Sequence, residues 1–156
     1  MRTVVIGVGN PYRADDGVGP AVVALLERRS VEGAVLARSL GEATELIELW
    51  TGADLAIVVD AVLAEPAHPG RVHRLVVHRP PAERGRAASS HGLDLGEAVE
   101  LARVLDRLPG ELVLYAVEVD RVGYGEGLSG PVARAAERLA GDIAAELAAG
   151  RALVVP

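Results

Sequence analysis

A segment near the N-terminus constrains the fold more than any other part of the sequence. It reads IGVGNPYRADDGVG over residues 6–19. The β-branched, apolar run from Thr3 to Ile6 leads into it, and apolar residues with helical spacing continue from Val18 to Leu26. This pattern predicts a strand, a glycine-rich loop and a helix in succession. Such a unit is typical of the start of an α/β sheet that is covered by helices.

The glycines make a nucleotide site the first hypothesis to test, because they let backbone amides approach phosphate groups. Gly7 and Gly9 match the first and third positions of a dinucleotide-binding fingerprint, but the sixth position is Tyr12. The loop also ends in Asp15 and Asp16, whose charges would repel a pyrophosphate. The loop therefore favours a cation or metal site over a nucleotide-binding module. A second interpretation is local: Asp15 caps the following helix and Asp16 lies in its first turn.

The composition restricts the class of protein. At 156 residues and 16.2 kDa, the chain fits a single domain over residues 1–156. The net charge is −6 and the arginines are scattered, so we expect no nucleic-acid partner. We find no apolar stretch of membrane-spanning length and no targeting segment, so we expect a cytoplasmic protein without a membrane partner. Because the chain has no cysteine, any metal must be bound by oxygen and nitrogen ligands.

Strand and helix patterns alternate along the rest of the chain. The run from Leu55 to Val59 is apolar at every position, as in a central parallel strand, and it ends in Asp60. The connection from Ala61 to Gly70 is too short for a parallel crossover. We therefore predict an α/β fold: a three-layer sandwich with a mixed five-stranded sheet whose strand four is antiparallel. The other predicted elements are strands over 34–37, 71–77 and 111–119, and helices around 46–50, 95–105 and 131–147.

Carboxylates follow several of the predicted parallel strands. Strand one leads into the loop that ends with Asp15 and Asp16, strand three ends in Asp60, and strand five carries Glu118 with Asp120 just beyond it. In open α/β sheets, ligands bind outside the carboxyl ends of the parallel strands. We therefore expect these side chains to gather at one edge of the sheet.

One histidine, His91, is predicted to join these carboxylates. The helix that begins near Leu95 leads into strand five, so its N-terminus must lie at the same edge, and the chain from Arg79 to Ser90 is long enough to return there. Asp16, Asp60 and His91 would together suit Zn²⁺, Mn²⁺ or Ni²⁺. The alternative is that they are unrelated polar residues in three loops.

The remaining histidines have a simpler interpretation. His68 falls in the connection between strands three and four, His73 lies within strand four, and His78 lies at its end. Histidine is often only partly buried, so we interpret all of these as surface residues without a metal-binding role.

With these motifs in place, the chain resembles the maturation endopeptidases of [NiFe] hydrogenases. The resemblance rests on GVGNPYRADDGVG near the start, IVVDAV at 57–62, SSHG around His91 and VEVDRVGYGEGLSGPV before the last helix. It implies an enzyme that removes the C-terminal extension of a hydrogenase large-subunit precursor after nickel insertion. It also implies that the metal ligands, here Asp16, Asp60 and His91, recognise nickel that the substrate supplies.

The leading hypothesis is therefore a nickel-dependent endopeptidase in which Asn10 and Asp15 support the loop beside the metal ligands. We expect it to act as a monomer on one protein partner, the large-subunit precursor. The alternative is a non-proteolytic chaperone that checks the same subunit for nickel. The sequence departs from the family pattern after strand two, where the family often has Asp-Gly-Gly-Thr and this chain reads SLGEAT over residues 39–44.

Overall fold

The computed structural model describes residues 1–78, 94–120 and 122–149. They form a five-stranded sheet with helices on both faces. None of the helices in these described segments is both long and apolar enough to cross a membrane. The elements are β1 (Thr3–Val8), the 3₁₀ helix η1 (Ala14–Gly17), α1 (Val18–Arg28), β2 (Val35–Ser39), α2 (Ala43–Trp50), β3 (Leu55–Leu63), β4 (Val72–His78), α3 (Asp94–Val104), β5 (Glu111–Val119) and α4 (Gly130–Ala148).

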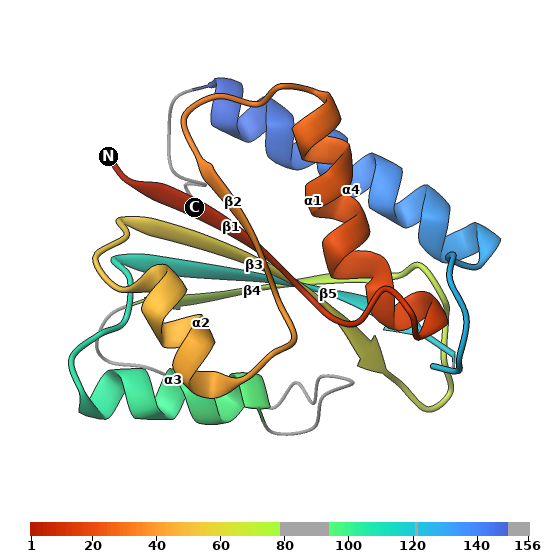
Figure 1. The fold of residues 1–156 in the computed structure, drawn as a ribbon, viewed down its shortest axis with the longest axis horizontal. Helices are drawn as coiled ribbons and strands as arrows, with labels where there is room; N and C mark the ends of the chain where they lie inside the picture. Colours follow the sequence, from red (N-terminus) through yellow and green to blue (C-terminus); the bar gives the residue numbers. More distant parts are fainter. Residues whose placement is uncertain (79–93, 121, 150–156) are drawn as a thin grey trace.

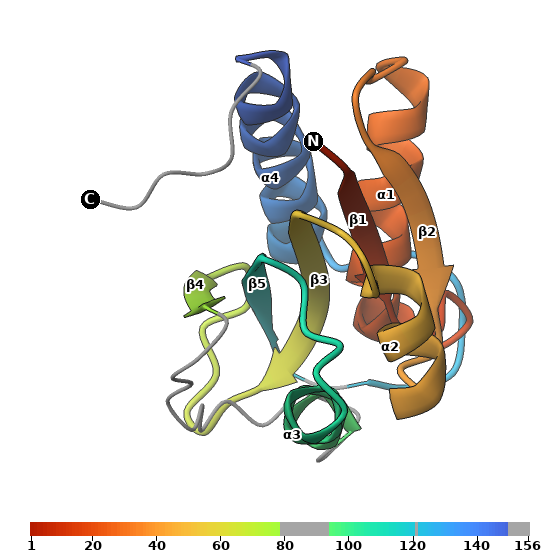
Figure 2. The same cartoon turned by 90° about the vertical axis from the view of Figure 1, so that its left-hand side faces the viewer.

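The sheet separates two apolar cores (Figures 1 and 2). α1 and α4 cover one face, and α2 and α3 cover the other. Alternate residues of the central strands enter opposite cores: Val5 and Ile57 pack beneath α1 and α4, whereas Ile6 and Val58 pack against α2 and α3. This explains why the central strands are apolar at nearly every position, and it confirms the predicted three-layer sandwich.

The strand order is β2-β1-β3-β5-β4. β1 pairs in parallel with β2 and β3, and β3 pairs in parallel with β5. β4 runs antiparallel to β5 at the edge of the sheet, with Val72 opposite Val117. The prediction of an antiparallel fourth strand is confirmed, and the connection that precedes β4 contains no helix.

The end of β3 differs from its predicted position. The sequence pattern predicts that this strand ends at Asp60, but the strand continues to Leu63. It continues because Val62 and Leu63 pair with Glu118 and Val119 of β5. Asp60 therefore lies within a paired strand, opposite Ala116 of β5.

Two glycines bring α1 directly onto the sheet. A Cβ atom at Gly19 would lie 2.4 Å from the carbonyl oxygen of Val8 and 2.5 Å from that of Val59. A Cβ atom at Gly7 would lie 2.3 Å from the carbonyl oxygen of Gly19. These distances exclude any larger residue unless the backbone shifts. The glycines of the first segment are thus explained by close packing of backbone on backbone, and this packing positions η1 over the carboxyl ends of β1 and β3.

Candidate functional site

The first loop folds back on itself around Asp16. The amide of Asn10 donates a hydrogen bond to Asp16 Oδ2 over 2.9 Å, and the amide of Tyr12 donates to Asn10 Oδ1 over 2.9 Å. Gly9 allows this fold because a Cβ atom there would lie 1.9 Å from the carbonyl oxygen of Asp16. Asp16 is only 2% exposed as a result. The loop therefore holds a buried carboxylate in one orientation through its own backbone.

Asp15 links this loop to the last helix. Its Oδ1 accepts a hydrogen bond of 2.7 Å from the amide of Ser129, and its Oδ2 accepts one of 2.8 Å from the Ser129 hydroxyl. Neither η1 nor α1 has a side-chain hydrogen bond at its N-cap, so Asp15 does not cap its own helix. Instead it binds the residue that precedes α4. Asp15 thereby joins segments that are far apart in the sequence.

A further contact holds the strained start of η1. Ala14 has a φ of 54°, a left-handed conformation that residues other than glycine rarely adopt. Its amide donates to the carbonyl oxygen of Gly125 over 2.8 Å, and the Gly125 amide donates to Tyr12 over 2.9 Å. The glycine-rich loop after β5 therefore forms a short bridge to the first loop. Strain of this kind persists only where surrounding contacts maintain it, and it is common near functional sites.

Asp60 lies beneath this loop on β3. It is 1% exposed, and its Oδ1 accepts a hydrogen bond of 2.8 Å from the amide of Ala61. η1, which carries Asp16, contacts β3, which carries Asp60. Two of the residues that the sequence predicts as metal ligands are thus buried carboxylates on contacting elements.

The third predicted ligand, His91, lies outside the described residues. α3 runs opposite to β5 and begins on the side toward which the parallel strands run, as the sequence pattern predicts (Figure 1). Within residues 1–78, 94–120 and 122–149, no group of three His, Cys, Asp or Glu residues could hold a metal ion. The triad of Asp16, Asp60 and His91 therefore remains a prediction.

Glu118, near the end of β5, contacts a different set of polar residues. Its Oε2 lies 2.5 Å from His73 Nε2 and 4.0 Å from Arg71 Nε, and its Oε1 accepts a hydrogen bond of 2.9 Å from the amide of His68. The hydrogen bond to His73 lowers the pKa of Glu118 most, followed by the backbone bond from His68, and both act against the effect of burial. The cluster joins β4 and the preceding connection to β5.

The sequence interpretation missed this cluster. His68 and His73 are about half exposed, as expected for surface residues, but both contact a carboxylate that is only 4% exposed. One signal was available: Glu118 is the only charged residue between Leu112 and Val119, and a buried carboxylate in such a strand requires polar partners. The remaining histidine of the described segments, His78, is the last residue of β4, as the sequence predicts.

Comparisons with known proteins identify the family of this chain. Residues 22–146 match the family model HycI, described as hydrogenase maturation protease. The chain is 28% identical over 119 residues to the Hydrogenase 2 maturation protease of Escherichia coli K12, a match that covers 75% of this chain and 73% of that protein. The chain therefore belongs to the hydrogenase maturation protease family, which is a family of peptidases, and the resemblance seen in the sequence is confirmed.

Solved structures show the same fold. The hydrogenase maturating endopeptidase HybD from E. coli superimposes with a TM-score of 0.79 at 24% identity, covering 96% of this chain and 94% of that one. The [NiFe] hydrogenase maturation protease HycI from Thermococcus kodakarensis KOD1 has a TM-score of 0.68 at 26% identity, covering 94% and 92%. The likeness to HybD shows the fold alone.

Proposed function

We propose that this protein is an endopeptidase that removes the C-terminal extension of a [NiFe]-hydrogenase large-subunit precursor after nickel has been inserted. The observation that carries the proposal is the pair of buried carboxylates, Asp16 and Asp60, on contacting elements at the carboxyl edge of the sheet. Membership of the maturation protease family supports the reaction class.

In this proposal, Asp16, Asp60 and His91 bind the nickel that the substrate already holds. Carboxylate and imidazole groups suit Ni²⁺, and an incomplete ligand set leaves room for ligands from the substrate. Burial strengthens the electrostatic interaction between the carboxylates and a metal ion, because the local dielectric constant is low. Nickel in this position would polarise the scissile carbonyl or activate water. Asn10 holds Asp16 in place and Asp15 holds the loop against α4, so both act as positioning residues.

Cleavage of a defined substrate tests the reaction. Purified protein is mixed with nickel-free and nickel-loaded precursor, and the mass of the large subunit is followed. We expect cleavage of the nickel-loaded form alone, and no cleavage by the Asp16→Asn or Asp60→Asn variants, with their circular dichroism unchanged. Equal cleavage of both forms would refute recognition of nickel. Binding without cleavage of either form would favour the nickel-checking chaperone.

A second experiment tests the ligand set. Crystals soaked in Ni²⁺, Zn²⁺ or Cd²⁺ should show an anomalous peak between Asp16, Asp60 and His91. In solution, His91→Ala should weaken Ni²⁺ binding, measured by calorimetry. His73→Ala is the matched control, because His73 contacts Glu118. A peak bound only by His68, His73 or His78 would contradict the assignment.

A further inference from the structure

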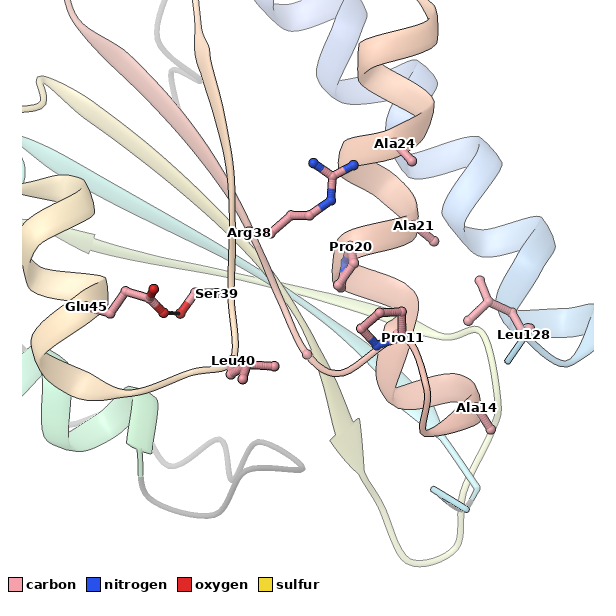
Figure 3. A pocket seen from close by; sticks show the side chains of 13 residues that line it. Pro11, Ala14, Pro20, Ala21, Ala24, Arg38, Ser39, Leu40, Glu45 and Leu128 are labelled. Carbon is pink, nitrogen blue, oxygen red and sulfur yellow. Dashed lines mark hydrogen bonds between the residues drawn. The ribbon is translucent and has the colours of Figure 1, made fainter. Parts of the chain in front are cut away.

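A cavity of about 520 Å³ lies next to the first loop and is lined by α1, the end of β2 and the segment before α4 (Figure 3). This volume is within the range of about 300–1,000 Å³ that is typical of ligand-binding pockets. Ala14 and Gly17 line it, and these two residues flank the Asp15–Asp16 pair in η1. The cavity and the proposed metal site therefore share one short structural element.

The lining of the cavity is mostly apolar. Prolines, alanines, glycines and leucines form most of the wall, and the small side chains of Ala21 and Ala24 leave space along α1. The charged groups are already engaged: Arg38 binds both carboxylate oxygens of Glu27, over 2.7 and 3.1 Å, and Glu45 accepts a hydrogen bond of 2.6 Å from Ser39. An uncharged, apolar occupant fits this wall better than a charged one, because burying a charge without a new partner is costly.

The walls of the cavity are connected by hydrogen bonds. The amide of Gly9 donates to the carbonyl oxygen of Ser39 over 2.9 Å, which joins the first loop to the end of β2. The Ser39 hydroxyl also accepts a 3.0 Å bond from the amide of Gly41, which orders the turn before α2. A wall held in this way costs little entropy to order when a peptide binds.

Large side chains are exposed around this region. Tyr12 is 64% exposed, Leu40 is 66% exposed, and Tyr124, whose loop is bridged to Tyr12 through Gly125, is 99% exposed. The chain contains only three tyrosines, and two of them lie in these loops. Aromatic side chains are enriched in protein interfaces, so this distribution favours a protein partner over a small molecule.

We infer that the cavity binds an apolar segment of the C-terminal extension of the large-subunit precursor. The inference rests on the proposed function. Ala14 and Gly17 line the cavity and flank Asp15 and Asp16 in η1, so the inferred position of the peptide has its scissile bond at Asp16 and a neighbouring part in the cavity. Arg38 and Glu45, the charged residues of the lining, already have partners. The side chains of that segment are therefore apolar. Ala21 and Ala24 thus determine specificity by the space they leave.

Ala21→Leu tests this assignment by filling the cavity from a half-buried position on α1. The dissociation constant is measured for two probes, the nickel-loaded precursor with its extension and the same subunit with the extension deleted. We expect Ala21→Leu to weaken binding of the full precursor by about 10-fold or more, because the leucine displaces an apolar group of the peptide. Binding of the truncated subunit should be the same for the variant and the wild type.

Ala145→Leu, at an exposed position of α4, is the matched control and should bind both probes like the wild type. Thermal unfolding checks that each variant is folded, and Ala24→Leu replaces Ala21→Leu if the latter is not. Equal binding of the full precursor by the wild type and the cavity variant would overturn the inference. An equal loss for both probes, or no binding by the wild type, would also overturn it. Cleavage is recorded in the same samples: extension-dependent binding without cleavage would leave the inference standing and refute the proposed protease activity.

Discussion

Two regions at the carboxyl edge of the sheet bury carboxylates in different ways. In the first loop, Asp16 is 2% exposed and accepts a hydrogen bond from the backbone amide of Asn10. At the end of β5, Glu118 is 4% exposed and contacts the side chains of His73 and Arg71. The sequence alone would class both as acidic residues near the ends of parallel strands.

The difference lies in which parts of the molecule each carboxylate joins. Glu118 bonds to residues of β4 and its preceding connection through both its side chain and its backbone: its amide donates to Arg71 and its carbonyl accepts from Gly70. It therefore secures an edge strand. Asp16 is oriented by the loop that contains it, and that loop is held in turn by Asp15 and Ser129. Such support is typical of groups that must keep a defined position in a site.

The largest effect is expected on the rate of cleavage, which should fall when the first loop is changed and stay nearly the same when the Glu118 region is changed. Asp16→Asn should reduce cleavage of the nickel-loaded precursor by more than about 100-fold, because it removes a proposed ligand charge. Glu118→Gln should change the same rate by less than about threefold, because Glu118 belongs to the other cluster. Initial rates of cleavage measure both. A comparable loss in the two variants would show that the regions act as one site.

The next largest effect is expected on the free energy of unfolding, when Glu118 is replaced. Glu118→Gln should lower the free energy of unfolding by about 1–2 kcal/mol at neutral pH, towards the low end of this range because His73 and Arg71 are half exposed to water. Denaturant unfolding, followed by circular dichroism, measures the change. An unchanged free energy of unfolding would contradict the structural role of Glu118.

The contribution of Glu118 to the stability of the fold should depend on pH. The pKa of Glu118 lies below its ordinary value of 4.5 in the folded protein, chiefly because of His73. Its carboxylate therefore stabilises the fold above the unfolded pKa, and this contribution is lost as the pH falls through the folded pKa. The difference between the wild type and Glu118→Gln should be constant just above pH 4.5 and shrink in more acidic solution. A difference that grew on acidification would be inconsistent with this assignment.

The smallest effect is expected at the link between the first loop and α4. Ser129→Ala removes the hydroxyl bond to Asp15 and should cost about 1 kcal/mol of stability. It should also slow cleavage by about 10-fold, because the loop is less firmly positioned. Ser129→Thr keeps the hydroxyl and should restore the rate. A failure of threonine to rescue cleavage would indicate that the effect of alanine is not due to this bond.

The sequence predicted the sheet well because its signals are local. The apolar run from Leu55 to Val59 indicated a central parallel strand, and the short connection after it indicated an antiparallel neighbour. Asp16 and Asp60 were expected at one edge, and the structure places them on contacting elements. His91 stays a prediction.

Other features depend on pairing between distant segments, which periodicity does not determine. The extension of β3 to Leu63 exists because β5 continues beside it. The bond between His73 and Glu118 requires the register that places Val72 opposite Val117. The cavity likewise depends on how α1 lies against the end of β2, and no single stretch of sequence specifies this.

The close contact of α1 with the sheet limits how this protein can adapt to a substrate. Because Gly19 touches the backbone of both β1 and β3, α1 cannot slide or tilt without a collision. The proposed peptide site therefore has α1 as a fixed wall, and the side chains on α1 set its shape. An engineer who wished to redirect this protein to another precursor would change Ala21 and Ala24 on α1 and leave Gly19 intact.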